Sequence, residues 1–179
     1  MNDRYAVLVA PCIISPGFQV ATKNTHWNHM FINVMLEFDI DIIPLLCVES
    51  TFKGYDCGLK RNKHGIDYYS SNPDFIEHCN KASCTISKNI LNMIKGGYTF
   101  VAILGIEHSP SCAVNYIYTY NKGMLKRSGL FFDSLKKDLS NIDISIPFIG
   151  INRRYPTKAL KQLRNCIIIS KSLRLGELT

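Results

Sequence analysis

Short apolar runs alternate along this chain with longer segments in which apolar residues recur every three or four positions. The runs cover about residues 5–11, 40–46, 99–106 and 146–151. Their length and their content of Val, Ile and Leu favour β-strands. The second run is apolar throughout after Asp41, which is typical of a strand buried on both faces.

The segments between the runs carry the spacing of amphipathic helices. A first helix is expected after residue 26, with Asn24 or Thr25 as its N-cap. A second begins at Asn72-Pro73, with Asn72 as the cap, and ends before Gly96. A third follows Ser128 as its cap. The apolar stripes of the three helices are, in order, Trp27, Met30, Phe31, Val34, Met35 and Phe38; Phe75, Cys79, Ala82, Ile86, Ile90 and Met93; and Phe131, Leu135 and Leu139.

Three further segments have weaker patterns. Residues 48–72 are polar and rich in glycine, and a connection this long is usually a functional loop. Residues 114–123 predict an extended excursion or a small hairpin arm outside the main sheet. The tail predicts a short helix near 157–163, followed by a last apolar run at 166–169.

Strand and helix alternate four times, and the chain contains no internal repeat. This order predicts an α/β protein with a doubly wound, mostly parallel sheet and helices on both faces, a Rossmann-like three-layer sandwich. A length of 179 residues suits one domain with a substantial core, so we expect residues 1–179 to form a single domain.

Composition narrows the class of protein. Hydrophobic residues make up 46% and charged residues 20%, as in ordinary globular proteins. The N-terminus lacks the features of a secretory signal, and no apolar run approaches the roughly 20 residues needed to cross a bilayer. We therefore expect a cytoplasmic protein without a membrane partner. The net charge of +7 is spread over several small clusters, which disfavours a nucleic-acid partner and suits small anionic or nucleobase-like ligands.

The seven cysteines are the most informative residues. Their number is odd and no export signal precedes them, so metal binding or catalysis is favoured over disulfides. Cys12, Cys47 and Cys112 each stand just beyond the end of a predicted strand. In a parallel sheet all three thiols would emerge at the carboxyl edge, where ligand sites of such sheets lie. Three converging thiolates suit an iron–sulfur cluster that leaves one iron open for substrate.

Other interpretations of the cysteines remain open. Free cysteine is often a small buried packing residue, and the chain has no CxxC pair. Cys57, in the glycine-rich loop, is a candidate fourth ligand that would saturate the cluster. Cys79 lies on a helical stripe and is expected in the core. Cys84 and Cys166 have no neighbours that suggest chemistry.

The residues around the thiols resemble those of a known family. The element Ser109-Pro110-Ser111-Cys112, the pair of Cys47 and Glu49 two residues apart, and a cysteine closing the first strand look like the stand-alone thiouracil desulfidase family. Residues 58–65, 75–79 and 146–151 look like one subgroup of it. The resemblance covers nearly the whole chain in order. It departs from the family at Val48, where proline is expected, at Ala113, where glycine is expected, and in the segment after Cys12.

The resemblance implies that Cys12, Cys47 and Cys112 hold a [4Fe-4S] cluster whose fourth iron binds the sulfur of a thiolated base. It also implies a role for Glu49, for which we expect general-base catalysis because its carboxylate must stay near Cys47. A loop-capping carboxylate is the alternative. Ser109 and Ser111 are candidates for orienting water or tuning the cluster, or else they form a turn.

Four charged or titratable residues are weaker candidates. Glu107 and His108 are alternates for proton transfer, although a histidine beside a strand end is more often only hydrogen-bonded. Arg153 and Arg154 follow the fourth strand and suit either an anionic substrate or solvent.

We therefore expect an iron–sulfur-dependent desulfidase that acts on a small thiolated base such as thiouracil, or on a similar thioamide. Two alternatives belong to other classes. One is a cluster-bearing sulfur-transfer protein, for example toward tRNA, for which Tyr116, Tyr118 and Tyr120 beside Lys122, Lys126 and Arg127 are the candidate RNA patch. The other is a non-catalytic α/β metal-binding module.

Overall fold

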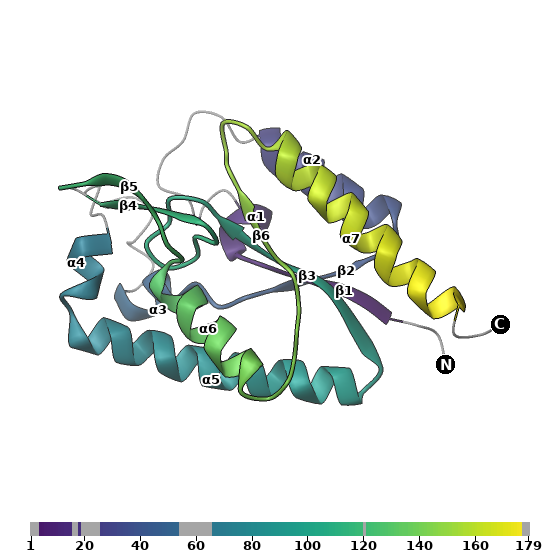
Figure 1. Cartoon of the computed structure of the whole chain (residues 1–179), viewed down its shortest axis with the longest axis horizontal. Helices are drawn as coiled ribbons and strands as arrows, with labels where there is room; N and C mark the ends of the chain where they lie inside the picture. Colours follow the sequence, from purple (N-terminus) through teal and green to yellow (C-terminus); the bar gives the residue numbers. More distant parts are fainter. Residues whose placement is uncertain (1–3, 16–17, 19–25, 54–65, 120, 177–179) are drawn as a thin grey trace.

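A four-stranded parallel sheet forms the centre of the molecule in the computed structural model (Figure 1). The structure describes residues 4–15, 18, 26–53, 66–119 and 121–176. The strands are β1 (Arg4–Val9), β2 (Asp41–Pro44), β3 (Tyr98–Ile106) and β6 (Phe148–Ile151), in the order β2-β1-β3-β6. All three strand pairings are parallel, as the alternation of strand and helix predicts.

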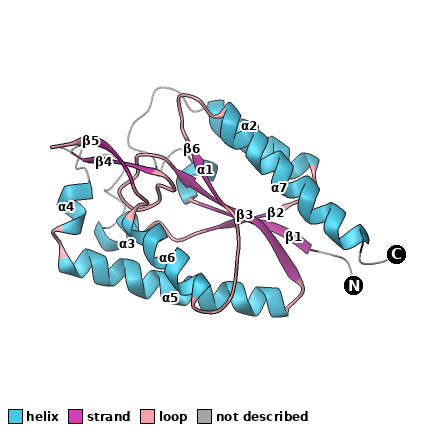
Figure 2. Ribbon diagram, viewed as in Figure 1, coloured by secondary structure: helices cyan, strands magenta, loops and turns pink. Residues whose placement is uncertain are grey.

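Helices cover both faces of this sheet. One pair, α2 (His26–Glu37) and α7 (Thr157–Gly176), packs on one face, and α5 (Pro73–Lys95) and α6 (Leu130–Ser140) pack together on the other (Figure 2). Three short helices follow strands or precede α5: α1 (Pro11–Ile14), α3 (Val48–Lys53) and α4 (Ile66–Ser70). The predicted Rossmann-like α/β sandwich is therefore confirmed.

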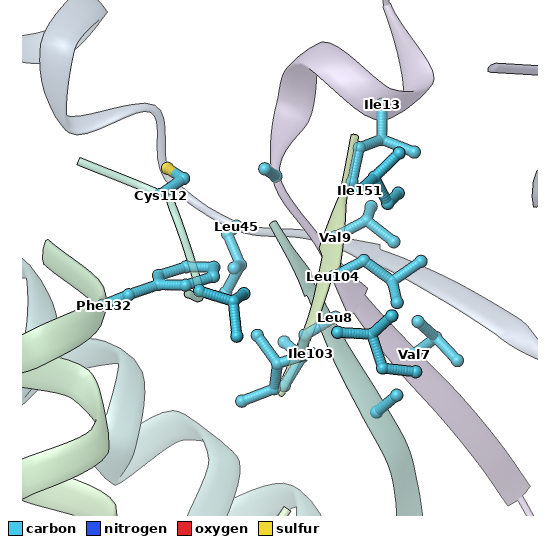
Figure 3. Packing of buried hydrophobic residues seen from close by; sticks show 14 of the residues in the cluster. Val7, Leu8, Val9, Ile13, Leu45, Ile103, Leu104, Cys112, Phe132 and Ile151 are labelled. Carbon is cyan, nitrogen blue, oxygen red and sulfur yellow. The ribbon is translucent and has the colours of Figure 1, made fainter. Parts of the chain in front are cut away.

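The hydrophobic core lies on both sides of β1 and β3. From Phe100 to Ile106 every residue of β3 is buried, which explains the unbroken apolar run in the sequence. Figure 3 shows Val9, Leu104 and Ile151 packed within this core, with Cys112 at its periphery on the side of Leu45 and Phe132. The core thus reaches the carboxyl edge of the sheet.

Several local predictions are confirmed. Asn72 caps α5 by accepting a hydrogen bond from the Phe75 backbone N–H, and Gly96 is its C-cap. The predicted arm is an antiparallel hairpin of β4 (Tyr116–Thr119) and β5 (Gly123–Lys126), separate from the main sheet. No helix in the described ranges is long and apolar enough to cross a membrane.

Two predictions for the first half of the chain are wrong. Strand β2 lies at the edge of the sheet, so its four residues are exposed or half-buried instead of buried on both faces. Residues 48–72 are not one irregular loop, because α3 and α4 occupy its two ends. Helix α3 forms because Val48 is buried and the Phe52 ring packs edge-on against Phe75 of α5. Residues 54–65, with Cys57, lie outside the described residues, as do Asn24 and Thr25.

Two predictions for the second half are wrong as well. Gly129, not Ser128, is the N-cap of α6, because the Ser128 hydroxyl donates its hydrogen bond to the Val114 carbonyl. The tail is one continuous helix, α7, with no break before its Ile-rich segment. Its buried residues Ala159, Leu163 and Ile167 recur every four positions, so one side of a long helix reaches the core.

Candidate functional site

The three cysteines predicted as ligands follow three adjacent strands. Cys12 lies in the first turn of α1 after β1, Cys47 lies between β2 and α3, and Cys112 lies in the loop that follows β3. Because β2, β1 and β3 are parallel neighbours, all three residues are at the carboxyl edge of the sheet.

The thiols also influence one another electrostatically. Burial, with smaller contributions from Cys47 and Glu49, raises the pKa of Cys12 to about 12, and Arg153 acts in the opposite direction. Burial also raises the pKa of Cys112 well above its usual value. Cys12, Glu49 and Cys47 add to that shift, and a hydrogen bond from Ser111 opposes it. The four acidic groups therefore form one electrostatic unit, which disfavours thiolates unless a positive charge is bound.

Across the described residues, no three His, Cys, Asp or Glu side chains are grouped so that they could hold a metal ion. One ion requires all donors at bonding distance from one point, whereas each thiolate of a cluster binds its own iron. Cys12, Cys47 and Cys112 supply the type of donor that a cluster takes, with one thiolate for each of three irons.

Glu49 lies beside the thiols in the first turn of α3 and is only 3% exposed. Its Oε1 accepts a hydrogen bond of 2.5 Å from the Ser111 hydroxyl. The Ser109 hydroxyl donates to the same oxygen over 3.5 Å, at the limit of a hydrogen bond. The structure thus brings together Glu49, Ser109 and Ser111, the three residues predicted for catalysis.

Ser109 also shapes the turn that carries Cys112. Its Oγ accepts hydrogen bonds from the backbone N–H groups of Ser111, at 3.3 Å, and of Cys112, at 3.0 Å. This is the local turn expected of a Ser-Pro sequence. Ser109 therefore fixes the backbone at Cys112, and Ser111 is the better placed of the two serines to act on Glu49.

The first turn of α6 holds the same segment from the other side. The backbone N–H groups of Gly129, Leu130 and Phe132 donate to the carbonyls of Ala113, Pro110 and Ser111, respectively, over 2.9–3.1 Å. A Cβ at Gly129 would lie 2.5 Å from the Ser111 carbonyl carbon, so only glycine permits this approach. The first N–H groups of a helix have no acceptor within the helix itself. Here they bond to the Cys112 loop and orient it.

Cys12 is held by a residue that the sequence analysis missed. The side-chain amide of Asn28, on α2, donates to the carbonyl of Cys12 at 3.0 Å and to that of Ile13 at 2.7 Å. Asn28 is only 1% exposed. The one indication in the sequence was that Asn28 follows Trp27, a residue of the predicted apolar stripe. An amide that is buried beside such a residue must have hydrogen-bond partners.

Glu107 and His108, the alternates for proton transfer, have contacts other than those of Glu49, Ser109 and Ser111. The carboxylate of Glu107, 6% exposed, accepts bonds from the Asn115 amide at 2.7 Å and from the Tyr116 backbone N–H at 2.9 Å. It therefore fastens the loop that follows Cys112. Burial lowers the pKa of His108, whereas Glu107 acts in the opposite direction. Arg153 and Arg154, both exposed, also lower this pKa.

The remaining cysteines differ in burial, and one of them lies outside the described residues. Cys79 is buried in the core of α5, as predicted, and its burial, with a smaller effect of Glu49, raises its pKa to about 12. Cys84 is exposed, and Cys166 is half-buried on α7. Cys57, the candidate fourth ligand, lies outside the described residues.

Comparison with known proteins adds no relative. The chain matches no protein-family model, no curated protein and no solved structure. Any function must therefore be argued from the site itself.

Proposed function

We propose that this protein is an iron–sulfur-dependent desulfidase that removes sulfur from a thiolated nucleobase such as thiouracil, or from a similar small thioamide. One observation carries the proposal: cysteines at the ends of three adjacent parallel strands interact electrostatically with one another and with the buried, hydrogen-bonded carboxylate of Glu49. Cys12, Cys47 and Cys112 would hold a [4Fe-4S] cluster, and one iron would lack a cysteine ligand.

The cluster, when bound, would supply a sulfur-seeking Lewis acid that polarises the C=S bond of the substrate. The overall reaction exchanges sulfur for oxygen: water adds its oxygen to the thiocarbonyl carbon, and the C–S bond breaks with release of sulfide. Carbon leaves as a carbonyl, and no net electron transfer is required.

Glu49 would act as the general base. Its carboxylate raises the pKa of the Cys12 and Cys112 thiols, which supports a position beside the proposed cluster. It would take one proton from the attacking water and pass it to the departing sulfide. The bond from Ser111 to Oε1 would hold this carboxylate in a fixed orientation during the reaction.

The two serines would position these groups. Ser111 also lies 3.6 Å from the Cys112 sulfur, so it is placed to donate to a thiolate when Glu49 is engaged with water. Such a bond would tune the electronic properties of a cluster. Ser109 would act through the backbone of the same turn.

The test is a metal and activity assay on protein purified without oxygen. We expect about four irons and four sulfides per chain, as the proposed cluster requires, and release of sulfide from thiouracil in step with uracil formation. Cys84→Ser is the matched control for Cys→Ser changes at residues 12, 47 and 112, because Cys84 is exposed and lies within α5 instead of after a strand. Only the latter three should abolish both iron binding and sulfide release.

Other outcomes would identify the alternatives. Stoichiometric zinc, or no metal, would reject the proposal in favour of an α/β binding module. Four irons without release of sulfide from any thioamide would instead indicate a sulfur-transfer protein.

A further inference from the structure

A pocket lies between the loop that follows Cys112, the end of α6 and the segment that leads into β6. Its volume is about 640 Å³, within the range of pockets that bind small molecules. Its walls are evenly divided between apolar and polar side chains. They comprise Val114, Leu139, Ile144, Ile146 and Phe148 together with Asn115, Lys136, Ser140, Asp143 and Ser145. The pocket shares Val114 and Asn115 with the loop that follows Cys112, but it does not include the cysteines, Glu49, Ser109 or Ser111.

Lys136 is the one amine in this lining, and its position is fixed by two acceptors. The amine donates to the Ser128 hydroxyl oxygen at 2.6 Å and to the Val114 carbonyl at 3.2 Å. The Ser128 hydroxyl donates its hydrogen bond to the Val114 carbonyl, at 2.8 Å, so its oxygen acts as an acceptor for the Lys136 amine. The nitrogen also lies 5.2 Å from the centre of the Phe148 ring.

This arrangement accommodates a neutral amine. A neutral amine has two N–H groups and one lone pair, and the two acceptors use both N–H groups. Within the described part of the chain no carboxylate lies within 4 Å of the Lys136 nitrogen to form an ion pair. Only the Phe148 ring, 5.2 Å away, favours the charged form, and no hydrogen bond uses a third proton. When the amine is neutral, its lone pair is left for a ligand.

The surrounding charges do not reverse this preference. Burial lowers the pKa of Lys136, and the more distant Asp133 and Glu107 oppose that shift without cancelling it. Asp143 also lines the pocket. A lysine with a lowered pKa is the usual nucleophile for carbonyl carbons.

We propose that this pocket binds a small aldehyde or ketone and that Lys136 holds it as an imine. The nitrogen lone pair attacks the carbonyl carbon, and the carbonyl oxygen leaves as water after it has taken up both protons of the amine. The new C=N bond replaces one C=O bond, so no oxidant or reductant is needed. Loss of both N–H groups frees Ser128 and Val114, which can still bond to each other. The apolar walls around Phe148 favour a ligand with a hydrocarbon or aromatic body.

The experiment uses benzaldehyde as the probe, with cyanoborohydride to trap the imine on the full-length chain. Peptide mass spectrometry then gives the rate of benzylation at each lysine. We expect Lys136 to react at least about fivefold faster than Lys137, its exposed neighbour, at neutral pH, because binding in a pocket raises the local concentration of the aldehyde. The rate at Lys136 should saturate with benzaldehyde concentration, and the rate at Lys137 should rise linearly.

Two variants make the test specific. Ser128→Ala removes one acceptor that fixes the amine and should slow the trapping at residue 136 while leaving Lys137 unchanged. Lys136→Arg keeps a cation but cannot form an imine, and it should abolish the saturable label. A linear rate at Lys136 that equals the rate at Lys137 would overturn the proposal. This assay needs no iron and no thioamide, so its result is independent of the function proposed for the thiols.

Discussion

Glu49 is a buried carboxylate beside three thiols, and its charge is the property to test first. Glu49→Gln retains the shape and one oxygen acceptor for Ser111 but cannot take a proton from water. We expect iron content to stay at the wild-type level and sulfide release from thiouracil to fall about a hundredfold, the usual effect of losing a general base. Iron analysis and an initial-rate assay on the same anaerobic sample measure both quantities.

The control for this variant is Glu77→Gln. Glu77 is exposed on α5 and pairs with Lys81, at 2.6 Å on the helix surface, so its loss should change neither quantity. Wild-type turnover in Glu49→Gln would remove Glu49 from the mechanism and leave it as a structural carboxylate.

The thiol of Cys12 gives a second prediction at the scale of the residue, for the metal-free protein. Its pKa of about 12 means that the thiol stays protonated at pH values where an ordinary cysteine is already a thiolate. Since only the thiolate is alkylated, we expect the reaction of Cys12 with iodoacetamide to keep rising between about pH 9 and 12, whereas a short cysteine peptide levels off above its ordinary pKa. Mass spectrometry of quenched samples gives the rate at this cysteine. A plateau near pH 9 would show that Cys12 does not share the environment described here.

The junction between α6 and the Cys112 loop decides whether the third thiol is in place. Gly129→Ala would put a methyl group against the Ser111 backbone, 2.5 Å from its carbonyl carbon. We expect the loop to shift, the free energy of unfolding to fall by about 1–3 kcal/mol, as for other overpacked sites, and iron binding to weaken. Urea unfolding and anaerobic iron titration measure the two effects.

Gly123→Ala separates the loss of stability from the loss of the site. Gly123 begins β5 with a φ of 66°, which strains any residue that has a side chain, but a Cβ there would meet no atom within 4 Å. It should destabilise the protein without affecting iron. Equal iron binding in both variants would mean that α6 does not position Cys112.

The pattern along the chain predicted those elements whose signals are local. Helix α5 combines an Asn cap, a proline at its first position, a regular stripe and terminal glycines, and it formed as expected. The three strand-end cysteines followed from strand prediction alone, since parallel strands bring their carboxyl ends to one edge. Asn28 was not predicted, because its partners lie 15 and 16 residues away and arise only when α2 packs beside α1.

The errors share one physical cause, which is dependence on tertiary neighbours. The apolar residues of β2 predict a buried strand, but whether a strand lies at the edge of the sheet depends on the topology of the whole chain. Ser128 is an ordinary cap residue by type, yet Val114 supplies a better partner from 14 positions away. The Ile-rich end of α7 suits a strand by propensity, and only its packing against α2 and the sheet maintains the helix.

At the scale of the whole molecule, the proposed cluster would join three crossover connections that are otherwise separate. Cys12 leads from β1 toward α2, Cys47 leads from β2 into α3, and Cys112 stands between β3 and the hairpin of β4 and β5. The unfolded chain does not contain the formed site. The free energy of binding a group to all three cysteines therefore adds to the stability of the folded state.

Heating the iron-loaded and the metal-free protein therefore tests the site as a unit. A cluster contributing about 2 kcal/mol would raise the Tm by roughly 4–8 °C in a chain of this size. Hydrogen exchange should locate the difference: protection should increase at α1, at α3 and in residues 107–115, and change little in the middle of α5. Cys84→Ser should retain the whole gain in Tm, whereas Cys47→Ser should lose it. An unchanged Tm on iron loading, with protection unaltered at the sheet edge, would show that iron binds elsewhere, because a cluster bridging these connections must hold their backbones together.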